Sequence, residues 1–177
     1  MVVAGAGYDG RALCYAKPGV RWFEIDHPAT QADKVARIAR LAMPTPHLTF
    51  VAADFANDDV GGALARAGHD RETPTLFLCE GAAVYLDLVV IVSLLRALCA
   101  AAAAGSRLAI SVSTGTSSER RQRFQAVVGA LGEPASTVLT AAAAAGILAS
   151  TGWQELSPVT ARTTASVRAG FLTIGPA

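Results

Sequence analysis

The chain opens with a glycine-rich turn of the kind that lets a backbone come close to a nucleotide. Gly5-Ala6-Gly7-Tyr8-Asp9-Gly10 follows the short apolar run Val2–Ala4, and the acidic residues Glu24 and Asp26 come about 20 residues later. Glycines let the chain turn sharply with no Cβ in the way, and an acid at the end of the next strand can accept hydrogen bonds from ribose hydroxyls. The arrangement predicts a nucleotide site, although a tight turn without a ligand would use the same glycines.

Three further segments place polar or aromatic side chains just after predicted strands. The strands, with the residues that follow them, are Arg21–Ile25 with Asp26 and His27, Thr49–Ala52 with Asp54 and Phe55, and Thr75–Cys79 with Glu80. Ligands of open α/β sheets bind at the carboxyl ends of the strands, so we expect these residues to share one edge with the glycine turn. Asp54 has an alternative role as a helix cap. Glu80 would be costly to bury without a partner, which favours a functional role.

The glycine pattern alone does not identify the nucleotide. It fits a dinucleotide such as NAD and also S-adenosyl-L-methionine, whose adenosine binds at the same switch point of a parallel sheet. A short-chain reductase would use a Tyr-x-x-x-Lys acid/base pair, and the sequence contains none. An NAD-dependent reductase is therefore the weaker interpretation.

Four motifs, taken in order, resemble the leucine carboxyl methyltransferase-like family, which includes many bacterial S-adenosyl-L-methionine-dependent methyltransferases. The motifs are Gly5–Arg11, Trp22–Lys34, Val51–Phe55 and Phe77–Leu86, and the likeness extends from residue 1 to about residue 153. The resemblance implies a Rossmann-like methyltransferase sheet, mostly parallel with a C-terminal antiparallel hairpin. It also implies S-adenosyl-L-methionine as the cofactor and methyl transfer to an oxygen, on a carboxylate or hydroxyl of a small molecule.

The resemblance also assigns residues to the cofactor. These residues are Gly5, Ala6, Gly7, Asp26, His27, Asp54, Phe55 and Glu80. Within this set, the two glycines would line the methionine part, Asp26 would bind the ribose hydroxyls, and Asp54-Phe55 would contact the adenine. Glu80 would face the methionine end or the acceptor pocket.

Two residues are candidates for the acceptor side. For Tyr85, the alternative is a packed ring with a hydrogen-bonded hydroxyl. Arg11 can meet a carboxylate or pair with Asp9 to steady the glycine turn. No residue stands out as a general base, so no catalytic residue is assigned. A carboxylate acceptor needs no base and a hydroxyl does, which favours the carboxylate.

Family members usually carry a largely helical segment before the first strand, and it supplies an arginine for the methionine carboxylate and part of the acceptor pocket. This chain begins inside that strand. One expectation is therefore a weakened enzyme, or a cofactor-binding or assembly module without turnover. The other is a homodimer in which a second copy covers the site, because exposed apolar surface favours association.

Strand-like runs alternate with helical patterns, which predicts the α/β class. The remaining strands are Val2–Ala4, Arg107–Val112 and a final antiparallel pair, Glu155–Thr160 and Ser166–Ile174. The predicted helices are Pro28–Leu41, Asp87–Ala104 ended by Gly105, Ser117–Leu131 and Leu139–Ala149. Trp153 is predicted to lie in the core.

Composition limits the class of protein further. The 177 residues predict a single domain over 1–177, and a net charge of +1 with 16% charged residues lacks the excess of a nucleic-acid binder. The longest apolar stretch, Leu86–Ala104, is interrupted by Asp87, Ser93 and Arg96, so we expect no membrane span. The first residues lack a signal-peptide pattern, which predicts a cytoplasmic location.

Neither the cysteines nor the histidines have the spacing of a metal site or a disulfide framework. These residues are Cys14, Cys79, Cys99, His27, His47 and His69. We expect no metal, three reduced thiols packed as small apolar groups, and histidines at the surface or at helix ends.

Overall fold

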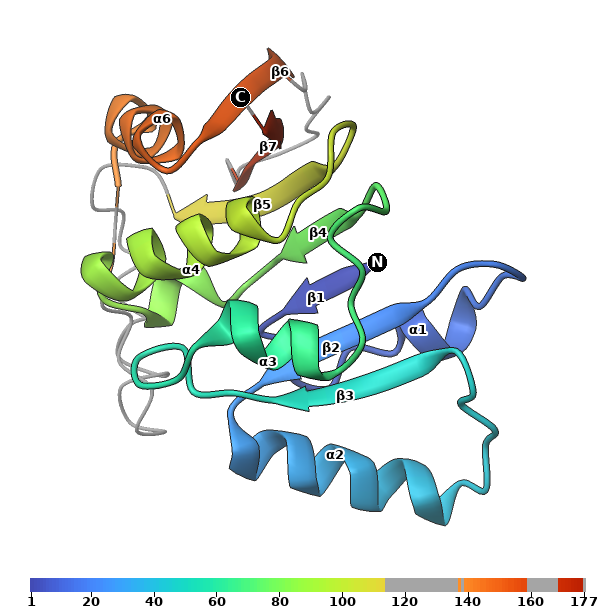
Figure 1. Cartoon of the computed structure of the whole chain (residues 1–177). Helices are drawn as coiled ribbons and strands as arrows, with labels where there is room; N and C mark the ends of the chain where they lie inside the picture. Colours follow the sequence, from blue (N-terminus) through green and yellow to red (C-terminus); the bar gives the residue numbers. More distant parts are fainter. Residues whose placement is uncertain (114–136, 138, 159–168, 177) are drawn as a thin grey trace.

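The computed structural model describes residues 1–113, 137, 139–158 and 169–176, and these contain a seven-stranded sheet in the order β3-β2-β1-β4-β5-β7-β6 (Figure 1). The strands are β1 (Val2–Ala4), β2 (Trp22–Asp26), β3 (Leu48–Ala52), β4 (Leu76–Cys79), β5 (Arg107–Ser113), β6 (Trp153–Pro158) and β7 (Ala169–Pro176). The first five strands are parallel, and β7 pairs antiparallel with both β5 and β6. The predicted fold class is confirmed, with the last strand inserted between β5 and β6.

In the part of the chain that the structure describes, six helical segments connect these strands. They are α1 (Arg11–Cys14), α2 (Pro28–Arg40), α3 (Val60–Arg66), the 3-10 turn η1 (Ala83–Tyr85), α4 (Leu88–Ala100) and α6 (Ala141–Ser150). The sequence predicts residue ranges for α2, α4 and α6 but none for the short α1, α3 and η1. The predicted helix Ser117–Leu131 lies outside the described residues.

The helix predicted over Asp87–Ala104 is too long, because α4 ends at Ala100. The alanines that follow belong to a turn, in which Ser106 donates its backbone N–H to the Ala103 carbonyl and Gly105 adopts a φ of 83°. The Ser106 hydroxyl accepts a hydrogen bond from the Thr75 N–H at 2.9 Å, which ties this turn to the start of β4. Alanine's helix propensity is thus outweighed by the need to return the chain to β5.

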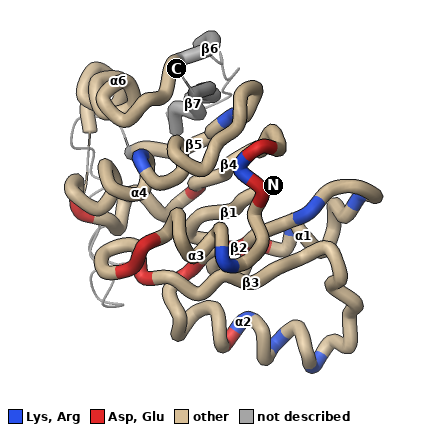
Figure 2. The backbone as a smooth tube through the Cα atoms, in the orientation of Figure 1, with Lys and Arg blue, Asp and Glu red and all other residues tan. Residues whose placement is uncertain are grey.

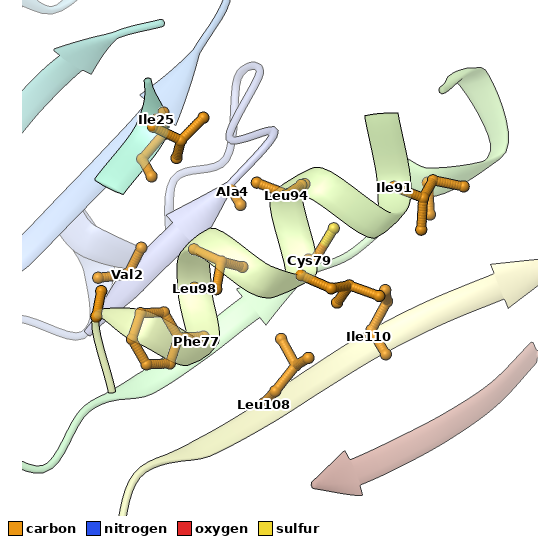
Figure 3. Packing of buried hydrophobic residues seen from close by; sticks show 14 of the residues in the cluster. Val2, Ala4, Ile25, Phe77, Cys79, Ile91, Leu94, Leu98, Leu108 and Ile110 are labelled. Carbon is orange, nitrogen blue, oxygen red and sulfur yellow. The ribbon is translucent and has the colours of Figure 1, made fainter. Parts of the chain in front are cut away.

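One face of the sheet is covered by α3, α4 and α6 and forms the main apolar core. Figure 3 shows Leu94 and Leu98 of α4 packed over Phe77 and Leu108 of neighbouring strands. Trp153 is 1% exposed and donates its indole N–H to the Leu95 carbonyl at 3.0 Å. Its predicted core position is confirmed.

The opposite face, covered by α1 and α2, is less apolar. Side chains alternate along β2, so Phe23 and Ile25 join the main core, while Trp22 and Glu24 point to this second face. Glu24 is fully buried there, and Lys34 of α2 is 3% exposed. A buried charged pair therefore lies on this face, whereas the main core on the other face is built mostly of apolar side chains.

Several absences predicted from the sequence can be compared with the described residues. Within these residues, no helix combines the length and apolarity that a membrane crossing requires, and no three His, Cys, Asp or Glu side chains gather as metal ligands. All three cysteines are free, and burial raises the pKa of Cys79 to about 12. Cys14 is exposed, so the expectation that it packs as an apolar group is wrong.

His69 departs from the expectation of a surface or capping histidine. Its ring lies half-buried, edge-on to Phe23 with centroids 5.4 Å apart, and it hydrogen bonds the Thr75 hydroxyl at 3.1 Å. Burial lowers its pKa below the usual value of 6.5, so the folded protein keeps this ring neutral under conditions in which the unfolded chain protonates it.

We predict that His69 makes the fold less stable as the pH falls through about 6.5. In the window between the lowered pKa and 6.5, the unfolded chain binds more protons, so the free energy of unfolding declines on acidification by at most about 1.4 kcal/mol per pH unit. The advantage of wild type over His69→Phe, measured by urea denaturation from pH 7.5 to 5.5, should shrink. Glu24 acts in the opposite direction but is common to both proteins, so parallel curves would contradict the assignment.

Candidate functional site

The glycine loop and the end of β4 lie on either side of the point where the strand order reverses. From β1 the chain runs outward through β2 and β3, then returns to place β4 on the other side of β1. Such a switch point is where ligands of open parallel sheets bind, at the carboxyl ends of the strands. The four predicted segments all leave the sheet at this edge, as expected.

The closest approach among these segments is at Gly5. Its φ is 74°, and a Cβ built there would overlap the Cβ of Ala82 and reach within 3.9 Å of the Phe55 ring. Gly5 therefore packs directly against the segments that follow β3 and β4. Three of the four motifs meet at this residue because it has no side chain.

Asp26 holds the second glycine of the loop. Its Oδ2 accepts the Gly7 N–H at 2.6 Å, and its Oδ1 accepts the His27 N–H at 2.7 Å. Each carboxylate oxygen keeps further acceptor capacity. A Cβ on Gly7 would have no neighbour within 4 Å, so the space beside this loop is open. An acceptor pair next to open space fits the hydroxyls of a ribose.

His27 is exposed, and its Nδ1 accepts the Ala29 N–H at 3.3 Å, which caps α2. Its predicted place beside Asp26 holds, and the capping contact explains its residue type.

Glu80 and Asp9 are joined by Arg11. The guanidinium lies 2.9 Å from Glu80 Oε2, and its Nε donates to Asp9 Oδ2 at 2.7 Å. The Asp9 hydrogen bond raises the pKa of Arg11, and Arg11 keeps the pKa of Asp9 low against the effect of burial. The predicted Asp9–Arg11 pairing is confirmed. Glu80 is exposed, so the argument from the cost of burying it is wrong.

Asp54 does not cap the following helix, because Asp59 does so through the Gly62 N–H. Asp54 instead accepts the Ala56 N–H at 2.9 Å and the Asn57 side-chain N–H at 2.8 Å, which lower its pKa. Figure 2 shows this acidic segment between β3 and α3 at the same edge of the sheet. The capping alternative is excluded for Asp54, whose side chain shapes the loop that carries Phe55.

Tyr85 lies in η1 and is 37% exposed. The ring is therefore exposed, and the alternative of a packed ring is wrong. Its peptide N–H donates to the Ala82 carbonyl at 3.0 Å, so Tyr85 lies one turn beyond the residue that faces Gly5.

The sequence did not point to two residues that shape the site. Ser111 of β5 accepts the Gly81 N–H at 2.8 Å and so fixes the turn between Glu80 and Ala82. Lys34 of α2 donates to the Asp9 carbonyl at 2.8 Å and lies 2.6 Å from Glu24 Oε2. The sequence did carry a signal for Lys34, because this charged residue lies four positions before Ile38, on the face of α2 that is buried.

Comparison with known proteins gives the family. The model of the family named leucine carboxyl methyltransferase matches residues 1–99 of the 177 in the chain. This chain belongs to the leucine carboxyl methyltransferase family. The matched region includes the glycine loop, Asp26, Asp54 and Glu80, and it is shorter than the likeness to residue 153 that the sequence suggested.

Relatives in this family carry the name "Putative S-adenosyl-L-methionine-dependent methyltransferase". One from Frankia alni is 38% identical over 117 residues, and one from Mycolicibacterium smegmatis is 38% identical over 128 residues. These alignments cover 64% and 71% of this chain but only 40% and 42% of the relatives. The chain therefore spans about two fifths of the length of the curated relatives it matches.

Solved structures share the fold at low sequence identity. The mitomycin 7-O-methyltransferase MmcR has a TM-score of 0.68 at 15% identity, covering 99% of this chain and 48% of that one. Magnesium protoporphyrin IX methyltransferase from Synechocystis, with bound SAH, has a TM-score of 0.62 at 15% identity, covering 99% of this chain and 73% of that one. The fold is that of S-adenosyl-L-methionine-dependent methyltransferases.

We predict that Gly5→Ala disrupts the site and costs about 2 kcal/mol or more in the free energy of unfolding. The substitution adds left-handed backbone strain to an overlap with Ala82. Gly10→Ala is the matched control, because Gly10 has a φ of −100° and open space around its Cβ position. It should cost about 0.5 kcal/mol or less. Equal losses in chemical denaturation would show that the contact at Gly5 is not limiting.

Proposed function

We propose that this chain binds S-adenosyl-L-methionine at the carboxyl edge of its sheet and takes part in methyl transfer. The observation that carries the proposal is the Asp26–Gly7 contact at 2.6 Å, which sets an acceptor carboxylate beside a glycine loop with open space next to it. Family membership and the names of the relatives support the same cofactor. When bound, this cofactor supplies a methyl group already activated on a sulfonium.

The residues of this edge divide into parts that suit the parts of that cofactor. Asp26 would accept the ribose hydroxyls with its remaining lone pairs, and the loop at Gly5 and Gly7 would line the methionine portion. Phe55 would lie against the adenine, on the loop shaped by Asp54. Glu80 would face the methionine end, where its bond to Arg11 limits its movement. Such preorganisation holds a reacting group at near-attack geometry.

We further propose that the acceptor is a small molecule with a carboxylate or hydroxyl oxygen, and that the carboxylate is favoured. Among the described residues at this edge, His27 is occupied as a helix cap and Glu80 as an ion-pair partner, so neither is set up as a general base. A carboxylate acceptor can attack the methyl group without a general base, whereas a hydroxyl acceptor needs one. Tyr85, exposed beside Ala82, is a candidate contact for the acceptor, and we assign no catalytic residue.

A second candidate is a module that binds the cofactor without turnover, alone or as part of a homodimer. The fold gives no argument against this candidate: a solved structure titled "A Pericyclic Reaction enzyme", a title that names no methyl transfer, has a TM-score of 0.64 to this chain at 14% identity, covering all of this chain and 43% of that one. The fold alone therefore does not dictate methyl transfer. Binding without methyl transfer to any acceptor would favour this candidate.

We predict saturable binding of S-adenosyl-L-methionine that Asp26→Asn weakens at least about tenfold. The substitution keeps the size of the side chain but replaces one acceptor oxygen with a donor, leaving a ribose hydroxyl without its partner. Isothermal titration calorimetry of both proteins measures this. Asp70→Asn removes the same charge at the opposite end of the sheet, in the turn before β4, and should leave the affinity unchanged.

Two outcomes would decide against the proposal. If neither S-adenosyl-L-methionine nor its demethylated product binds at millimolar concentration, the cofactor assignment is wrong. If NADH binds instead, the reductase interpretation replaces it. Where binding is found, incubation with radiolabelled cofactor and a panel of carboxylic acids and alcohols distinguishes the enzyme from the module without turnover.

A further inference from the structure

The glycine loop is anchored to the β2–α2 unit at three consecutive residues. Gly7 donates its N–H to Asp26 Oδ2, the Tyr8 hydroxyl donates to Asp33 Oδ2 at 2.5 Å, and the Asp9 carbonyl accepts from Lys34 Nζ at 2.8 Å. Tyr8 is 62% exposed and Asp26 is half-buried, so water competes for the first two anchors. Lys34, at 3% exposed, donates from a position that solvent hardly reaches.

Lys34 can be buried because Glu24 neutralises it. The two charged groups are 2.6 Å apart, both side chains are at most 4% exposed, and the carboxylate belongs to the central part of β2. Burial raises the pKa of Glu24, and Lys34 opposes this shift. Replacing a buried ion pair with apolar residues of similar size seldom lowers the stability of a fold. Stability alone therefore does not explain the Glu24–Lys34 pair.

The position of the Asp9 carbonyl gives the pair a specific task. Asp9 directly precedes Gly10, the N-cap of α1, and the first hydrogen bonds of α1 run to the Gly10 carbonyl from Leu13 and Cys14. Among the described residues, Lys34 is the donor to the Asp9 carbonyl. Its ammonium thus sets the orientation of the peptide that joins the glycine loop to α1, which carries Arg11.

We propose that Lys34, neutralised by Glu24, is a positioning residue that fixes the glycine loop in its cofactor-binding conformation. The proposal rests on the proposed function, because the loop is assigned there to S-adenosyl-L-methionine. Lys34 lies beneath the loop and acts through the Asp9 peptide. Glu24 serves to offset the cost of burying the Lys34 charge, while the bond from Lys34 to Asp9 fixes the loop, so the two residues have separable effects.

Three variants separate positioning from stability. Glu24→Gln retains a donor at Lys34, so it should lower the melting temperature and leave the cofactor Kd within about twofold of wild type. Lys34→Met keeps the aliphatic stem, strands a buried carboxylate and removes the bond to Asp9. The double variant, Glu24→Gln with Lys34→Met, has no stranded charge, so its melting temperature should be higher than that of Lys34→Met. Its Kd should stay about tenfold weaker than wild type, the size expected for a lost charge-assisted hydrogen bond.

Two measurements read out the proposal, with Arg40→Met as a control for charge loss on an exposed part of the same helix. Calorimetry gives the Kd for S-adenosyl-L-methionine, and amide hydrogen exchange without cofactor reports the Asp9 N–H, which donates to the Ala6 carbonyl at 2.7 Å. Exchange should accelerate at least about tenfold in Lys34→Met and in the double variant, but not in Glu24→Gln or Arg40→Met.

A double variant with wild-type affinity and wild-type loop exchange would overturn the proposal and leave the pair a purely structural role. Failure of wild type to bind the cofactor would overturn the proposed function instead. Hydrogen exchange would then still decide whether Lys34 fixes the loop.

Discussion

The site depends on the absence of a side chain at Gly5. At this residue the loop after β1 passes so close to Ala82 and Phe55 that a Cβ would overlap its neighbour, and the φ of 74° is one that glycine adopts without strain. This close approach lets segments from three strands converge on one edge. Gly5 and Ala6 both donate their N–H groups to the Ile25 carbonyl, so the loop runs beside the end of β2, where the Gly7 N–H meets Asp26.

The segments that meet at this edge are held in place by the packing on the two faces of the sheet, and the two faces are packed differently. On the face of α4, apolar side chains fill the space, and Trp153 closes the core with a bond to a helix carbonyl. On the face of α2, the space beneath the glycine loop holds the Glu24–Lys34 pair. An apolar contact resists separation but has no preferred direction, whereas a hydrogen bond orients the peptide it reaches. The polar pair therefore lies under the part of the backbone whose orientation matters most.

The sequence predicted the strands well because their apolar runs are short and end at polar residues, so the motif after each strand was also placed at the correct edge. It failed where tertiary context decides. The alanines after Ala100 have high helix propensity, yet the turn to β5 ends the helix. A helix cap was the alternative role for Asp54, but the cap lies five residues later at Asp59. Local patterns also gave no means of pairing Lys34 with Glu24, since the contact exists only once α2 folds back over β2.

The same difference between local and distant information explains why the cofactor is easier to assign than the acceptor. Every residue that we assign to the cofactor, from Gly5 to Glu80, lies within the 1–99 region that matches the family. These residues follow strands of a fold that is shared with solved methyltransferases at 15–18% identity, so the backbone geometry at this edge tolerates extensive change in sequence. An acceptor is recognised by side chains above that edge, which the sheet does not prescribe. Family membership thus supports the cofactor, which the backbone of this edge would bind, whereas the acceptor depends on side chains that the fold does not prescribe.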